Sequence, residues 1–200
     1  MDEYRIWNNT VSERQAREIA GRLEQGELMV YPTDTLYAMG CDALNVKAVE
    51  RICRLQGIRP DKVSLSIICK DIAMAAEYAR IENRGFRLLR DNTPGPFTFI
   101  FREVSKLPRA FKGRKEVGVR IPDCGAPLKI AEALGHPILT TSIDAEDCDY
   151  MVNPDLIAES YAAKADFILK GDEGGTEPST VVDCTGPEPE IVRQGKGELK

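Results

Sequence analysis

The sequence predicts one layered α/β domain that spans residues 1–200, and three observations support this fold class. Its 200 residues suit a single domain. Segments with helical periodicity alternate along the chain with short runs of β-branched and aromatic residues. Neither an internal repeat nor a low-complexity linker divides the chain. We therefore expect one large twisted sheet flanked by helices.

Short apolar runs predict the strands of this sheet. They are rich in β-branched and aromatic residues, and turn formers such as proline and glycine bound many of them. The run Phe97–Phe101, which follows the turn cluster Asn92–Pro96, is the clearest of them. In chain order we expect strands at 28–31, 65–69, 97–101, 117–121, 138–141, 167–169, 180–183 and 191–193.

Capping residues predict where the helices begin. Ser12 and Gln15 have the spacing of a capping box, and apolar residues at helical spacing follow them up to Gly26. Pro154, at a first helical position, opens a late helix that ends near Tyr161. The expected N-caps are Ser12, Asn45, Asp71 and Asn153, and a further helix is expected around 129–134.

The composition favours a cytoplasmic protein that does not cross a membrane. No apolar run approaches the length of a transmembrane helix, and the charged start Met1–Arg5 lacks the apolar core of a signal peptide. The six cysteines are scattered without a C-x-x-C pair, and the chain has one histidine, His136. We therefore expect reduced thiols and no metal held by the protein.

Several common catalytic motifs are absent from the sequence. It contains no G-x-x-x-x-G-K-[ST] phosphate loop, no G-x-G-x-x-G, no H-E-x-x-H and no G-x-S-x-G. A serine hydrolase would depend wholly on His136, which we expect in a turn between a helix and a strand. A bound nucleotide would therefore be held by groups other than a Walker loop.

Hydroxyl groups and arginines follow several of the expected strands. The segment Tyr31–Gly40 places threonines and an aspartate after a strand, and hydroxyl residues recur at 140–142 and 178–180. Ligands of open α/β sheets commonly bind at the carboxyl ends of strands. Hydroxyl and guanidinium groups suit phosphate and carboxylate oxygens. Threonines at strand ends also often serve only the local backbone, so the pattern by itself leaves a structural role open.

The positive charge is concentrated in one part of an acidic chain. The net charge is −5, yet residues 80–120 hold eleven Lys or Arg against four Asp or Glu, a local +7. Arg80, Arg84 and Arg87 recur at helical spacing, so we expect them on one face of a helix. This face is either a solvated basic surface or a contact surface for the phosphates of double-stranded RNA or tRNA.

Six segments along the chain carry recognisable motifs: Tyr31–Gly40, Thr93–Phe99, Val117–Pro122, Thr140–Ser142, Pro178–Asp183 and Val192–Gly195. Together they extend over nearly the whole chain, from about Leu28 to Gly197. In order and spacing they resemble the signature motifs of the YrdC/YciO family of threonylcarbamoyl-AMP synthase-like proteins. The stretches Asp91–Gly95 and Arg51–Arg54 are similar to the stand-alone YciO branch.

The resemblance implies an open, twisted, mostly mixed sheet with a large, positively lined concave cavity. Synthases of the family use ATP with Mg²⁺, L-threonine and bicarbonate to form threonylcarbamoyl-AMP, which feeds the t⁶A modification of tRNA. No catalytic side chain is assigned. The resemblance implies nucleotide contacts for Arg59, Thr98, Ser142 and Arg193, and substrate contacts for Thr33, Thr35, Arg120 and Ser179.

Two positions depart from the synthase motifs. The lysine of the family's K-x-R-P is Gly57 here, and the asparagine of its S-A-N is Asp144. One lost cation and one added carboxylate both oppose triphosphate binding, and a charge-assisted phosphate contact contributes roughly 1.5–3 kcal/mol. Two functions therefore stand side by side: a weak or altered ATP-dependent synthase, and a protein that binds double-stranded or structured RNA in translation or ribosome maturation.

Overall fold

Eleven strands form one sheet in the part of the chain that the structure, a computed structural model, describes. The described residues are 1–59, 62, 64–104, 106–113, 115–143 and 151–200. The strands are β1 (Asp2–Arg5), β2 (Met29–Tyr31), β3 (Ala38–Asp42), β4 (Ser66–Ile68), β5 (Ala79–Arg80), β6 (Phe97–Glu103), β7 (Glu116–Arg120), β8 (Ile138–Ser142), β9 (Phe167–Lys170), β10 (Thr180–Asp183) and β11 (Glu190–Arg193).

Helices flank this sheet, and four of them begin at the residues expected from the sequence. Ser12 forms the capping box with Gln15, and Asn45, Asp71 and Asn153 each accept a backbone N–H at the start of their helix. The helices are α1 (Glu13–Glu24), α2 (Val46–Leu55), α3 (Ile72–Tyr78), α4 (Asn83–Asn92), α5 (Gly125–Leu134) and α6 (Pro154–Tyr161), with a 3₁₀ turn η1 (Arg109–Gly113).

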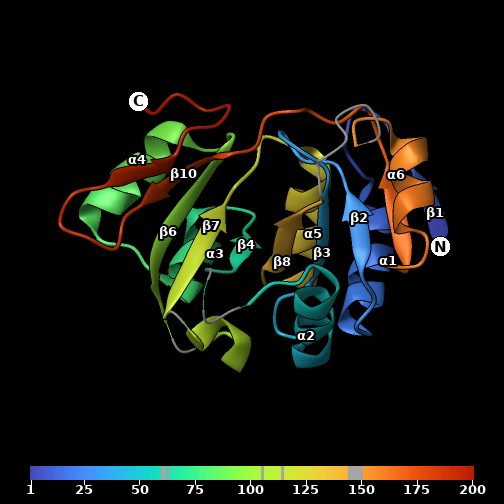
Figure 1. Cartoon of the computed structure of the whole chain (residues 1–200), viewed down its shortest axis with the longest axis horizontal. Helices are drawn as coiled ribbons and strands as arrows, with labels where there is room; N and C mark the ends of the chain where they lie inside the picture. Colours follow the sequence, from blue (N-terminus) through green and yellow to red (C-terminus); the bar gives the residue numbers. More distant parts are fainter. Residues whose placement is uncertain (60–61, 63, 105, 114, 144–150) are drawn as a thin grey trace.

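The strand order differs from the chain order. The sheet runs β1-β9-β2-β3-β8-β4-β7-β6-β10-β11, and β5 pairs with β6. The sheet is mixed: β4 and β7 are parallel, whereas β3 and β8, and β6 and β7, are antiparallel. Figure 1 shows a strongly twisted sheet, with β6, β7 and β10 on one side and β2, β3 and β8 on the other. The mixed, twisted α/β fold predicted from the sequence is therefore confirmed.

The sequence analysis missed three strands and misplaced one arginine. Strand β1 is short and mostly exposed, so it lacks an apolar signal. Strand β3 is fully buried, but it lies inside the Tyr31–Gly40 motif and carries a glycine. Arg80 belongs to β5, and α4 begins only at Asn83, so the expectation that Arg80 shares a helix face with the later arginines was wrong. Helical spacing alone does not show where a helix starts.

The two faces of the sheet carry different residues, which positions the site. On β6, Phe97, Phe99 and Phe101 are buried and stacked along one face. Because side chains alternate along a strand, Thr98 and Ile100 point to the opposite face. The aromatic face belongs to the hydrophobic core, and the other face carries the polar residues of the candidate site. No helix among the described residues is long and apolar enough to cross a membrane.

Candidate functional site

A cleft of about 570 Å³ lies over six consecutive strands of the sheet, β8, β4, β7, β6, β10 and β11. Volumes of this order are typical of small-molecule sites. Hydroxyl groups and charges line it, with a few apolar side chains between them. The polar lining residues are Lys62, Ser64, Ser66, Thr98, Glu116, Arg120, Thr140, Thr141, Ser142, Ser179, Asp183 and Arg193.

The floor of the cleft is flat at Gly118, in the middle of β7. Glu116, Gly118 and Arg120 share the cleft face of this strand because side chains alternate. A Cβ atom at Gly118 would lie 2.4 Å from Ser66 Oγ and 3.0 Å from Thr98 Cγ2. Only glycine therefore fits between the hydroxyl residues of the two neighbouring strands.

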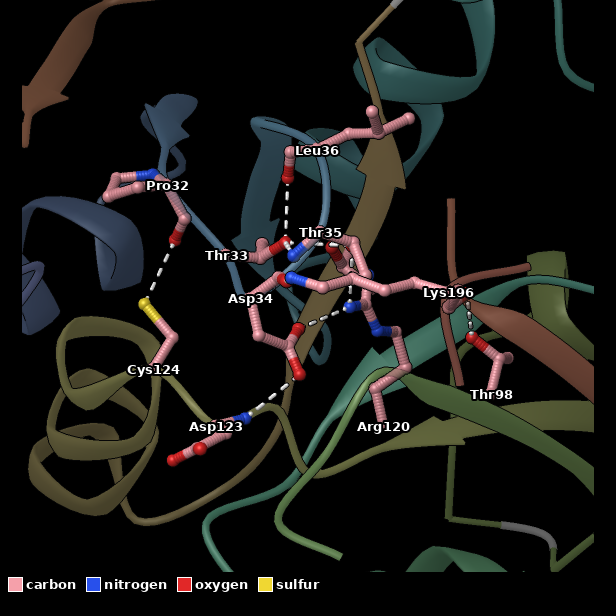
Figure 2. Close-up of polar contacts among 12 residues, drawn as sticks. Pro32, Thr33, Asp34, Thr35, Leu36, Thr98, Arg120, Asp123, Cys124 and Lys196 are labelled. Atoms are coloured by element: carbon pink, nitrogen blue, oxygen red, sulfur yellow. Dashed lines mark hydrogen bonds and ion pairs between the residues drawn. The ribbon is translucent and has the colours of Figure 1, made fainter. Parts of the chain in front are cut away.

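Arg120, at the end of β7, is the central charge of the site. Its side chain is 6% exposed and donates from Nη2 to Asp34 Oδ1 at 2.9 Å and to Thr35 Oγ1 at 3.1 Å. Figure 2 shows the guanidinium group beside the Thr33–Thr35 loop. The Nε atom of Arg120 is buried without a hydrogen-bond partner. A buried donor without an acceptor is costly, so Arg120 is held at this position at the expense of one hydrogen bond.

Arg193, at the end of β11, is the second positive charge of the cleft. Its Nη2 donates to the backbone oxygen of Ser179 at 2.8 Å and lies 3.3 Å from Ser179 Oγ. Ser179 Oγ in turn is 2.8 Å from Thr98 Oγ1. Burial and the nearby charge of Arg120 lower the pKa of Arg193 below its usual range. Two guanidinium groups close enough to repel each other favour an anion between them.

The predicted residues Thr33 and Thr35 do not line this cleft. Both side chains are buried, and their hydroxyl oxygens lie 3.1 Å apart. Thr33 Oγ1 also donates to the backbone oxygen of Leu36 at 2.6 Å. The two threonines border a second hollow of about 430 Å³, and Arg120 connects it with the cleft through its contact with Thr35.

Thr98, Arg120, Ser142, Ser179 and Arg193 line the same cleft, so the structure brings five of the eight predicted residues together. Their roles toward a ligand stay predictions.

Arg59 is exposed, directly after the cleft residue Ile58, but it is not part of the lining. Gly57 adopts a φ of +60° at the end of α2, where Ile58 N–H donates to the oxygen of Cys53 at 2.8 Å. This left-handed turn favours glycine and gives the missing lysine a local structural reason. Asp144 lies outside the described residues.

Asp34 is a site residue that the sequence analysis quoted in a motif but did not select. Besides Arg120, its carboxylate accepts the backbone N–H of Asp123 at 3.0 Å, and its backbone oxygen accepts Lys196 Nζ at 2.7 Å. The available signal was a carboxylate between the two threonines of a motif that follows a predicted strand. Thr140, whose hydroxyl accepts from Tyr31 at 2.6 Å, was likewise quoted in a motif but not selected. Ser64 and Ser66, before and at the start of β4, were missed because serine is common in and around strands.

Other reactive groups lie in settings that do not favour chemistry. Burial raises the pKa of Cys124 to about 12, so this thiol stays protonated near neutral pH. His136 Nδ1 lies 3.3 Å from Asp42 Oδ1, which is not part of the cleft lining. Within the described ranges, no three His, Cys, Asp or Glu side chains gather in a way that could hold a metal ion.

The predicted RNA-binding arginines border two hollows beside α4. Arg80 and Arg84 border one, and Arg84 and Arg87 border the other. Arg80 lies 3.7 Å from Glu82, and Arg84 forms an ion pair with Glu188. Carboxylates therefore already balance part of this charge. None of the three arginines lines the cleft.

A family model named Sua5/YciO/YrdC, described as telomere recombination, matches residues 22–195. The chain belongs to this family. It is 36% identical to the uncharacterized protein YciO of Escherichia coli K12 over 189 residues, which are 93% of this chain and 90% of that protein. A crystal structure of E. coli YciO superposes with a TM-score of 0.91 at 33% identity, covering 100% of this chain and 98% of that one.

The synthase branch of the family is also similar. Threonylcarbamoyl-AMP synthase of Pyrococcus abyssi is 29% identical over 188 residues, 92% of this chain but 55% of that protein. A crystal structure of P. abyssi Sua5 complexed with L-threonine superposes with a TM-score of 0.84 at 27% identity, covering 98% of this chain and 58% of that one. This family member binds the small molecule L-threonine.

Proposed function

We propose that this protein is a nucleotide-binding enzyme of the threonylcarbamoyl-AMP synthase type, which uses ATP, L-threonine and bicarbonate. One observation carries the proposal: Arg120 and Arg193 converge with the hydroxyls of Thr98 and Ser179 in one cleft. Guanidinium and hydroxyl groups that line one cleft suit the oxygens of an anionic substrate. Kinship with a threonylcarbamoyl-AMP synthase and with a threonine complex supports the choice of substrates.

The proposed reaction needs charge stabilisation more than a side-chain nucleophile. Threonine and bicarbonate condense to threonine carbamate with loss of water. A carbamate oxygen then attacks the α-phosphorus of ATP, and the bond to the leaving pyrophosphate breaks. Placing the two reactants together and compensating the phosphate charge are the main contributions a protein can make to such a step.

The residues of the cleft have the chemistry for these two tasks. Arg193 and Arg120 supply guanidinium N–H groups in fixed positions, and Thr98 and Ser179 supply hydroxyls that can donate or accept. We include Mg²⁺ as the counter-ion of the nucleotide, where it would neutralise part of the phosphate charge. The product would feed t⁶A modification of tRNA, as threonylcarbamoyl-AMP does for synthases of the family.

Pyrophosphate release from ATP tests this function. We expect release that requires both L-threonine and bicarbonate, and a loss of at least about tenfold in kcat/KM for Arg193→Gln. Arg84→Gln is the matched control, because Arg84 lies outside the cleft and should leave the rate unchanged. No release above the protein-free rate by the folded wild type would contradict the proposal.

A further inference from the structure

A buried carboxylate lies beside the arginines of the cleft. The side chain of Asp34 is 7% exposed, and its Oδ1 accepts from Arg120 Nη2 at 2.9 Å. Its Oδ2 accepts the backbone N–H of Asp123 at 3.0 Å. Each carboxylate oxygen therefore has a protein donor, and the side chain cannot rotate without losing both hydrogen bonds.

Asp34 fixes the direction in which Arg120 presents its remaining donors. The Nη2 atom is occupied by Asp34 and Thr35, at 2.9 Å and 3.1 Å. The Nε atom is buried and has no partner, and Arg120 lines the cleft. Because a guanidinium group is planar, holding Nη2 also fixes the plane in which Nε–H points.

Asp34 also sets the net charge at this end of the cleft. Among the lining residues, Arg120 and Arg193 supply the positive charge here. The carboxylate of Asp34 balances the charge of Arg120 in a site with little access to water. The two arginines and the aspartate together therefore carry one positive charge.

The remaining charged residues lie away from this end. In the sheet register Asp183 is level with Ile100 and Glu116 with Arg102, further along β6 than Thr98. Lys62 lies two residues before Ser64, whose hydroxyl donates to Glu116, so Lys62 belongs to the part of the chain at the Glu116 end of the cleft.

Lys196 is closer, since its Nζ donates to the backbone oxygen of Asp34. It borders the second hollow rather than the cleft, together with the carboxylates of Asp123 and Glu173. Lys196 is therefore placed on the side of the second hollow, outside the lining of the cleft.

We propose that Asp34 is a positioning residue that sets the charge of this subsite, so that the subsite selects a group with one negative charge, a carboxylate, over a polyanion. This inference rests on the proposed function and specifies it: the subsite takes the carboxylate of the amino acid. A second negative charge placed here would be buried without compensation.

Binding of two probes at one ionic strength tests the inference. L-Threonine and magnesium-free pyrophosphate are titrated by calorimetry into wild type, Asp34→Asn and Asp123→Asn. Asp34→Asn raises the charge of the subsite, so the affinity for pyrophosphate relative to L-threonine should rise about tenfold or more. Asp123→Asn removes a charge from the same rim without touching the Arg120 pair, and the ratio should change less than about twofold.

An equal change of the ratio in both variants would overturn the inference. The wild type gives a second measurement that does not depend on how the variants fold. It should bind L-threonine more tightly than pyrophosphate and should not bind threoninol, which lacks the carboxylate; the opposite order, or no binding of L-threonine, also overturns the inference. If these tests succeed and ATP-dependent pyrophosphate release is absent, the proposed function fails and the charge-setting role of Asp34 stands.

Discussion

Two arginines of this protein, Arg120 and Arg84, each pair with a carboxylate, yet their settings are opposite. The side chain of Arg120 is 6% exposed, and its partner Asp34 is 7% exposed. The side chain of Arg84 is 50% exposed, and its partner Glu188 is 74% exposed. Charge counting along the sequence assigns both arginines to the same basic stretch.

The difference shows that burial, rather than charge density, separates a ligand site from a solvated surface. Around the Arg120–Asp34 pair, water is largely replaced by protein, so each charge is felt strongly and each donor needs an acceptor. On α4, water and salt screen the same kind of pair, which contributes little. Variants can therefore test the comparison through stability as well as through binding.

The largest effect is expected from Arg120→Gln. This change leaves the carboxylate of Asp34 buried without its cation, and breaking a buried pair in this way costs about 3–5 kcal/mol. Arg84→Gln is the control, with an expected loss of at most about 1 kcal/mol. Urea denaturation of both variants measures the difference in the free energy of unfolding. Similar losses for the two variants would contradict the comparison.

Gly57→Lys should have an intermediate effect. The residue has a φ of +60°, and a side chain in this left-handed conformation costs about 1–2 kcal/mol. No heavy atom lies within 4 Å of a Cβ built there, so the loss reflects the backbone alone, and Gly57→Ala should lose as much. Denaturation checks this point, and calorimetry should show tighter ATP binding for Gly57→Lys only. Unchanged stability would argue against strain in this turn.

The pair Arg51–Asp166 lies between the two extremes and should show a weak pH dependence. Burial by itself raises the pKa of Asp166, but hydrogen bonds from Arg51 at 2.6 Å and 3.1 Å and from Leu28 N–H outweigh it, so the pKa is lowered. A lowered pKa means that the stabilisation is present above the unfolded-state pKa of about 3.9 and is lost as the pH falls below it.

Asp166→Asn should flatten the stability profile below pH ~4. The expected loss at neutral pH is at most about 1 kcal/mol, because the side chains of the pair are 40% and 30% exposed. Urea titrations between pH 3 and 7 provide the measurement, with Asp91→Asn as an exposed control whose carboxylate pairs with Arg90. An unchanged acid limb in Asp166→Asn would show that other carboxylates govern acid unfolding.

The smallest effect is expected from replacing Arg80, Arg84 and Arg87 together with Gln. Because Glu82 and Glu188 already pair with two of them, the salt dependence of any duplex RNA binding should decrease by about one unit of slope or less. Binding of ATP and L-threonine should stay unchanged. Fluorescence anisotropy across salt concentrations measures the slope. A decrease by three units would support a phosphate-tracking surface here.

Local signals in the sequence predicted most of the helices and strands. Ser12, Asn45, Asp71 and Asn153 cap helices as expected, because capping depends on residues only two or three positions apart. The start of α5 was placed late, since Cys124 provides no side-chain hydrogen bond at its N-cap. The order of the strands could not be read from the chain, because pairs such as β1 and β9 join residues far apart in sequence.

The candidate site was also predicted in part, because local motifs could be recognised and contacts between distant residues could not. The motifs predicted five site residues that all line the cleft, namely Thr98, Arg120, Ser142, Ser179 and Arg193. The separation of Thr33 and Thr35 into a second hollow depends on the conformation of one loop. The role of Asp34 depends on a contact between residues 86 positions apart, which composition and spacing do not show.

The order of the strands in the sheet has a consequence for how the cleft forms during folding. Its walls come from strands between β4 and β11 whose spatial order, β8-β4-β7-β6-β10-β11, interleaves early and late parts of the chain. The pairings of β8 with β4, of β4 with β7 and of β6 with β10 must each close a long loop before they gain contacts, which favours slow, cooperative folding. A molecule that binds the cleft therefore recognises the nearly complete fold, and its concentration raises the resistance of the whole chain to unfolding and proteolysis.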